Sequence, residues 1–389
     1  MATVTEQLTG PAVDESRVDS PTEGRNPRSV EIDCLSTLDV LRLLNAEDAT
    51  VAGAVAAALH DLAAAVDLVV AALAGGGRVH YLGAGTSGRL AAQDADELGP
   101  TYGLEPGRVV ARVAAYEGGA GSTGPSTTAD GETGAGSTGR STAAHGDTRA
   151  GSTRPSTAAD GEDDAVTGAD DAGSTRPSTA ADGEAGEGSA GSTRPSTAAD
   201  GEDDAVSGAA LGAAAGPDDV VIGITASART PYVVAALSAA RRAGAATVLI
   251  GSNPRAPLGA EVDVHVCLDT GPEAVTGSTR LKAGTAQKMA LNALSTAAMV
   301  RLGRTWSDLM IGAVATNAKL RGRLVHALVA ATGEDPQDCA AALDAARGDG
   351  RAALVALLGA VSVDTARAAL AEAGGSPRAA LATLASRRG

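Results

Sequence analysis

The segment RVHYLGAGTSGR (residues 78–89) carries the clearest fold signal in this chain. Its first five residues predict a short buried strand, and the glycine-rich run after them predicts a tight turn into a helix. A second unit of the same kind follows at 219–232, DVVIGITASARTPY. A helical segment (233–244) and two strand-like segments (246–254 and 262–273) come next. Alternating strands and helices of this kind predict an α/β fold with a doubly wound, mostly parallel sheet flanked by helices.

The regions around this core predict the domain organisation. Residues 36–73 repeat apolar side chains at three- and four-residue spacing, which predicts two helices before the first strand. Residues 1–35 are expected to form an N-terminal arm. The α/β domain then takes 36–117 and 201–326, and 327–389 are expected to form a small helical domain, because short apolar runs there are broken by Gly and Pro.

A repeat of the form GST-x-PST-x-ADGE interrupts the α/β domain over residues 118–200. Its copies have uneven spacing and are rich in Ser, Thr, Gly, Pro and Asp. Such a composition buries too little apolar surface to offset the entropy of the chain, so we expect a disordered insertion. A folded solenoid would need a regular period and an apolar stripe, and the repeats have neither.

Composition and charge exclude several classes of function. The net charge of −16 argues against a nucleic-acid partner, because binding to a phosphate backbone needs clustered Lys and Arg. Cys34, Cys267 and Cys339 are far apart and, like the five histidines, lack metal-ligand spacing, so we expect neither disulfides nor a metal site. The N-terminal segment has no apolar signal-peptide core, and no apolar run reaches membrane-spanning length. We therefore expect a cytoplasmic protein.

The turn GAGTSGR (83–89) is a candidate anion site. A glycine-rich turn between a strand and a helix directs backbone N–H groups and the positive end of the helix dipole at one point. The candidate ligand-binding residues are Gly85, Thr86, Ser87 and Arg89. A dinucleotide fold is the alternative, because the glycines also fit G-x-G-x-x-G.

A second turn between a strand and a helix, TASARTP (225–231), favours a phosphosugar over a dinucleotide. It again combines hydroxyl groups with an arginine, at Ser227, Arg229 and Thr230. Two such turns on one sheet suit a phosphosugar better than a pyrophosphate. The structural alternative is that Ser and Thr only cap tight turns.

Four segments resemble the N-acetylmuramic acid 6-phosphate etherases, which are relatives of the glucokinase regulatory protein. They are TEGRNP (22–27) and the stretches 77–103, 218–233 and 272–299. The resemblance implies a sugar-isomerase (SIS) type of domain. It also implies cleavage of the D-lactyl ether of N-acetylmuramic acid 6-phosphate without a cofactor, in the recycling of cell-wall amino sugars, by a homodimer.

The resemblance also implies two catalytic carboxylates. Glu97, in DADELGPTYG, matches the acid/base glutamate of the family. Glu202 stands at about the right distance before the second strand for the second acidic residue, although the repeats duplicate its surroundings at Glu162. One carboxylate would remove the C2 proton, and the other would help lactate to leave.

The most family-like stretch, 272–299, implies further contacts to the sugar. We expect Glu273, Ser278, Thr279 and Lys282 to line the pocket. Ala228 stands where the family usually has Gly, so its Cβ is expected to crowd the approach of the backbone to phosphate, at little cost if the local φ is negative. A phosphosugar isomerase and a non-catalytic sugar-phosphate sensor remain as alternative functions.

Overall fold

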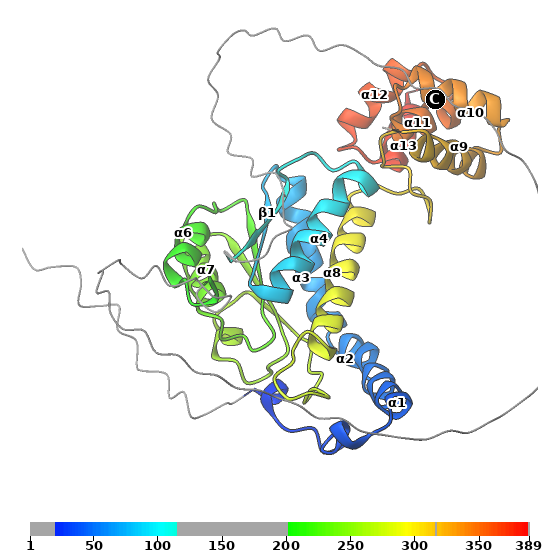
Figure 1. The fold of residues 1–389 in the computed structure, drawn as a ribbon. Coiled ribbons are helices and arrows are strands. Elements are labelled where there is room, and N and C mark those ends of the chain that lie inside the picture. Colours follow the sequence, from blue (N-terminus) through cyan, green and yellow to red (C-terminus); the bar gives the residue numbers. More distant parts are fainter. Residues whose placement is uncertain (1–19, 115–200, 316, 388–389) are drawn as a thin grey trace, which may run out of the picture. The chain divides into compact units, whose positions relative to one another are not determined.

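The computed structural model describes residues 20–114, 201–315 and 317–387 (Figure 1). The expectation for the repeats at 118–200 therefore lies outside the described residues, as does the expectation for residues 1–19. Within the described part, Ser20, Thr22, Asn26 and Ser29 are buried. The end of the predicted N-terminal arm thus packs against the rest of the protein.

A five-stranded parallel sheet forms the core. Its strands are β1 (Val79–Gly83), β2 (Val109–Val113), β3 (Val220–Ile224), β4 (Ala246–Gly251) and β5 (Val264–Cys267). Their order is β2-β1-β3-β4-β5, and every neighbouring pair is parallel. The predicted doubly wound α/β fold is confirmed. The order reverses direction between β1 and β3, and open α/β sheets bind their ligands in the crevice beyond the carboxyl ends of the strands at such a point.

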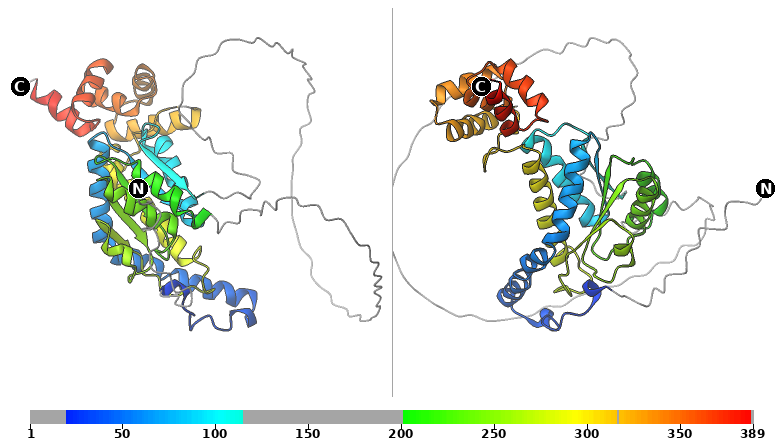
Figure 2. Two further views of the ribbon diagram at one scale, coloured as in Figure 1. Left: turned by 90° about the vertical axis from the view of Figure 1, so that its left-hand side faces the viewer. Right: turned by 180° about the vertical axis from the view of Figure 1, so that it is seen from behind.

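Helices cover both faces of the sheet (Figures 1 and 2). On one face α3 (Leu59–Ala74), α4 (Gly85–Tyr102) and α8 (Lys282–Arg301) form one apolar cluster with alternate strand residues, whereas α7 (Pro231–Arg242) packs on the residues between them. Successive side chains of a strand point to opposite faces of the sheet, which explains this division. The helix α6 (Ala205–Ala213) packs closely against α7, because Gly208 and Gly212 leave no room for a Cβ beside the α7 backbone.

Within residues 20–78, three α-helices precede β1, where the sequence predicts two. They are α1 (Thr37–Asp48), α2 (Val51–Ala57) and α3, and the chain bends at Ala58 between the last two. Only one residue of α1, Glu47, is buried. Val40, Leu43 and Leu44 on the same side of the helix are half-buried, so α1 contacts the rest of the chain through this charged group and a partly covered apolar stripe.

The C-terminal region is a helical unit with its own apolar cluster. It contains α9 (Ala318–Thr332), α10 (Pro336–Ala345), α11 (Gly350–Gly359), α12 (Val363–Glu372) and α13 (Pro377–Ser386). Each helix begins at an Asn, Asp or Ser whose side chain accepts a hydrogen bond from a backbone N–H of the first turn, which explains why short helices form here. The apolar cluster starts at Ile311, and the predicted boundary at 327 falls inside α9.

Among the described residues, no single helix is long and apolar enough to cross a membrane. Two pairs of consecutive helices meet the length and composition only when taken together, and they are bent by 61° and 107°. The same residues contain no cluster of three or more His, Cys, Asp or Glu side chains that could hold a metal ion.

Candidate active site

The first glycine-rich turn follows β1 at its carboxyl end and opens α4. Gly83 and Gly88 meet so closely that a Cβ on Gly88 would lie 2.6 Å from the Gly83 carbonyl oxygen. The residue before the helix, Ala84, provides no side-chain cap, so the N–H groups of the first turn have no such partner. An uncapped helix N-terminus of this kind favours a bound anion.

The side chains of this turn contact each other and α8. Arg89 Nη2 donates to Thr86 Oγ1 at 3.1 Å, and Ser87 Oγ donates to Gln287 Oε1 at 2.9 Å. Thr86 Cγ2 lies 3.6 Å from the position that a Cβ on Gly284 would occupy. The N-terminal turns of α4 and α8 therefore meet at the candidate anion site.

The second predicted turn follows β3, which is the neighbour of β1. Thr225 Oγ1 and Thr230 Oγ1 are 2.8 Å apart and share a hydrogen bond, and the Arg229 backbone N–H donates to Ser227 Oγ at 3.3 Å. The helix α7 then begins at Pro231 without a side-chain cap. Both predicted turns thus lie at the carboxyl ends of adjacent central strands.

Ala228 has a φ of 56°, so the negative φ that would let Ala replace Gly at little cost is not present. An L-residue in the left-handed region costs about 1–2 kcal/mol. Its side chain is only 2% exposed and belongs to the apolar cluster beneath α7. The cost of Ala at this position is therefore backbone strain rather than crowding of the crevice.

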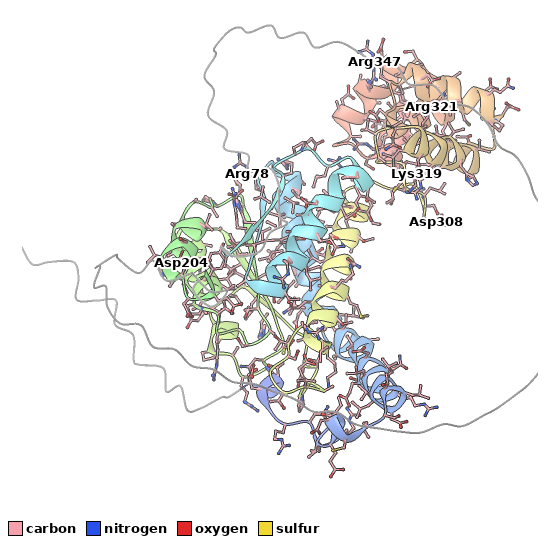
Figure 3. All side chains as sticks on the ribbon, in the orientation of Figure 1. Arg78, Asp204, Asp308, Lys319, Arg321 and Arg347 are labelled. Carbon is pink, nitrogen blue, oxygen red and sulfur yellow. The ribbon has the colours of Figure 1, made fainter. Side chains whose placement is uncertain are left out.

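Glu202 lies at the first turn. A Cβ on Gly85 would be 3.0 Å from Glu202 Oε1, which places this carboxylate against the start of α4. Partial burial raises the pKa of Glu202, and the neighbouring Asp203 raises it further. Asp204, labelled in Figure 3, fixes the chain just beyond, because its Oδ1 accepts from the Ser207 backbone N–H at 2.9 Å as the cap of α6. Glu162 lies outside the described residues.

Glu97 is exposed on α4, at a distance from that turn. It lies eleven positions beyond Thr86, which is three helical turns, so both side chains are on the same face of α4. The rise along the helix separates them by about 16 Å. Within one chain, the structure does not bring Glu97 and Glu202 together.

Glu273 and Lys282 are both buried and bonded to the protein itself. Glu273 accepts from the backbone N–H groups of Lys282 and Ala283, at 3.0 Å each, and so caps α8. Lys282 Nζ donates to Glu47 Oε2 at 2.7 Å. Ser278 and Thr279, by contrast, lie half-buried in the loop that leads into α8. The two ionic side chains therefore position this loop, whereas the two hydroxyl groups remain candidates for contact with a ligand.

The partners of Lys282 were not predicted from the sequence. Asn26 Nδ2 donates to Glu47 Oε2 at 2.8 Å, and Arg28 Nε pairs with Glu47 Oε1 at 2.8 Å. Burial opposes ionisation of Glu47, but Lys282, Asn26 and Arg28 together outweigh it, and the pKa of Glu47 is lowered. The TEGRNP motif signalled Asn26, whereas no pattern in the sequence signals Glu47.

Asp94, further along α4, joins this helix to β1 and α8. It accepts from Tyr81 Oη at 3.1 Å and from Ser295 Oγ at 2.9 Å. Burial raises the pKa of Asp94 to about 6, although these two hydrogen bonds act in the opposite direction. In the sequence Asp94 is one of three acidic residues within DADE (94–97), and no pattern distinguishes it from Asp96.

The raised pKa of Asp94 predicts a pH-dependent stability. Between about pH 4 and 6 the folded protein holds a proton that the unfolded chain releases, so the free energy of unfolding falls as the pH rises through this range. Asp94→Asn removes this titration. We expect the stability of Asp94→Asn relative to wild type to increase from pH 4 to 6, by up to about 3 kcal/mol. Urea unfolding of both proteins at several pH values measures the difference, and a constant difference would contradict the assignment.

Comparisons with known proteins are consistent with this arrangement. The family model described as "SIS domain" matches residues 205–297. The N-acetylmuramic acid 6-phosphate etherase of Thermobifida fusca is 47% identical over 341 residues, which cover 88% of each chain. The etherase of Mycolicibacterium smegmatis is 41% identical, over 92% of this chain and 97% of its own. That of Cutibacterium acnes is 39% identical, over 92% and 95%.

Proposed function

The chain belongs to the family of N-acetylmuramic acid 6-phosphate etherases, and we propose that it cleaves the D-lactyl ether of N-acetylmuramic acid 6-phosphate. It is an enzyme, a carbon–oxygen lyase. Water is consumed, and the products are N-acetylglucosamine 6-phosphate and D-lactate. We propose that the reaction takes place in the cytoplasm and returns cell-wall amino sugars to metabolism.

The position of Glu202 is the observation that supports this activity best. Its carboxylate lies against the first turn of α4, where uncapped N–H groups and the hydroxyls of Thr86 and Ser87 favour a phosphate. In this proposal Ser227, Arg229 and Thr230 complete the pocket from the neighbouring strand. A raised pKa makes the Glu202 carboxylate a stronger base than an ordinary glutamate, which suits removal of a proton.

The chemistry is an elimination followed by a hydration. In the open-chain aldehyde the C2 proton is α to the carbonyl group, so a carboxylate can remove it. The C3–O bond then breaks, and a carboxylic acid protonates the departing lactate oxygen. Water adds across the new C2–C3 double bond, with its hydroxyl going to C3. Glu97 and Glu202 share these proton transfers.

The distance between the two glutamates supports a homodimer. Both must reach adjacent carbons of one sugar, yet Glu97 lies about 16 Å along α4 from the turn that Glu202 contacts. Glu97 is exposed and has no hydrogen bond or ion pair among the described residues. We propose that each active site combines Glu202 of one copy with Glu97 of a second copy.

Release of D-lactate tests the activity directly. Purified protein incubated with N-acetylmuramic acid 6-phosphate should yield equal amounts of D-lactate and N-acetylglucosamine 6-phosphate. N-Acetylglucosamine 6-phosphate as the starting compound serves as the control for isomerase activity. A new sugar phosphate formed without lactate would support an isomerase instead, and binding without turnover would support a sensor.

A further inference from the structure

The amide of Gln287 is buried beside the first glycine-rich turn and is incompletely bonded. Gln287 lies in the second turn of α8 and is 1% exposed. Its Oε1 accepts from Ser87 Oγ at 2.9 Å, but its Nε2 has no hydrogen-bond partner among the described residues. A buried N–H donor without an acceptor costs about 1–3 kcal/mol. This position therefore needs a physical explanation.

The observed hydrogen bond also conflicts with anion binding at Ser87. A hydroxyl group has one proton, and Ser87 gives it to Gln287 Oε1. A phosphate dianion offers only acceptors. With this arrangement, Ser87 has nothing to donate to a phosphate at the start of α4.

Rotating the amide by half a turn removes the conflict. Oxygen and nitrogen then exchange places in a group of nearly unchanged shape. Gln287 Nε2 donates to Ser87 Oγ, and the Ser87 proton becomes free to point into the crevice. The atom without a partner is then a carbonyl oxygen, which proteins tolerate somewhat better than an unpaired N–H.

We propose that Gln287 is a positioning residue that orients the Ser87 hydroxyl group as a donor to the 6-phosphate. Binding of the phosphate selects the rotated amide, because only that arrangement supplies a proton to the ligand. Gln287 does not itself touch the substrate. The inference rests on the proposed phosphate site at Gly85, Thr86 and Ser87, and it adds the residue on α8 that prepares this site.

The test measures affinity for N-acetylglucosamine 6-phosphate by calorimetry, with unphosphorylated N-acetylglucosamine as the reference. Hydrogen bonds to charged groups contribute about 1.5–3 kcal/mol, so we expect Ser87→Ala to weaken binding of the phosphorylated sugar roughly tenfold or more. Gln287→Met keeps the volume but removes the amide, and should weaken it several-fold. Since Gln287 acts through Ser87, the double variant should bind no more weakly than Ser87→Ala alone.

Ser295→Ala is the matched control. Ser295 also lies on α8, and its Oγ also donates to a residue of α4, Asp94, but about two turns away from Gln287. Ser295→Ala therefore loosens the contact between α4 and α8 without changing the first glycine-rich turn. We expect its affinity for N-acetylglucosamine 6-phosphate to equal that of wild type.

Gln287→Glu provides a second test should Gln287→Met fail to fold. A carboxylate has nearly the same shape but only accepts, so it keeps the Ser87 proton and adds a negative charge near the phosphate. Binding should weaken by more than in Gln287→Met, and should recover as the pH falls and the new carboxyl group is protonated.

Two results overturn the inference. One is wild-type affinity in Gln287→Met, or in Gln287→Glu at a pH at which its new carboxyl group is ionised. The other is a double variant in which the losses of Ser87→Ala and Gln287→Met multiply. Different results would refute the proposed function. If wild type binds the phosphorylated and unphosphorylated sugars equally, the phosphate site is refuted. If it binds the phosphorylated sugar but releases no lactate from N-acetylmuramic acid 6-phosphate, the activity is refuted.

Discussion

Glu97→Gln is expected to lower kcat by roughly two to four orders of magnitude, since that is the usual contribution of a positioned acid or base. Glutamine has the shape of glutamate but cannot transfer a proton. Glu97 is exposed and has no bonded partner among the described residues, so the variant should fold as wild type does. Lactate release from N-acetylmuramic acid 6-phosphate measures kcat, and circular dichroism checks the fold.

Asp96→Asn is the control for this variant. Asp96 is the neighbouring exposed carboxylate on α4 and faces a different direction around the helix. It should retain wild-type kcat, which separates the loss of a proton donor from a general change in surface charge. Lactate release at the wild-type rate from Glu97→Gln would rule out a catalytic role for Glu97.

Exchange of the C2 proton in heavy water assigns the two roles. A variant without the base cannot remove this proton, so deuterium should not enter at C2. A variant without the acid can still remove it and return deuterium from solvent, although the C3–O bond breaks slowly. Comparing Glu97→Gln with Glu202→Gln therefore shows which carboxylate acts at C2.

Hybrid dimers of two inactive variants are expected to regain activity. If each site takes Glu202 from one copy and Glu97 from the other, a dimer of Glu97→Gln with Glu202→Gln has one site with both glutamates and one with neither. A purified hybrid carrying two different affinity tags should therefore show about half of the wild-type lactate release, because one of two symmetric sites is restored.

The parent variants serve as the controls, and each should remain nearly inactive at the same concentration. If both glutamates of a site came from one chain, neither site of the hybrid would be complete. An inactive hybrid would thus show that the active site lies within one copy, and it would remove the distance argument for the homodimer.

The sheet and the two turns of the candidate anion site could be predicted from the sequence alone. Strand residues 79–83 and 220–224 and the Gly, Ser and Thr residues after them are local signals, since strand propensity and turn chemistry act over only a few residues. The sequence also determined the family, through motifs that are continuous in the chain. Ala228 shows the limit of such signals, because the residue type alone did not give the sign of its φ.

Which side chains meet could not be predicted from the sequence and depends on the tertiary structure. Lys282 pairs with Glu47, which lies 235 positions away in the sequence. Ser87 bonds to Gln287, which lies 200 positions away. The tertiary structure also placed Glu202 at the first turn while Glu97 stayed three helical turns away. Local sequence patterns fix secondary structure, whereas these contacts depend on how distant helices pack on one sheet, and the pairing of buried charges follows from that packing.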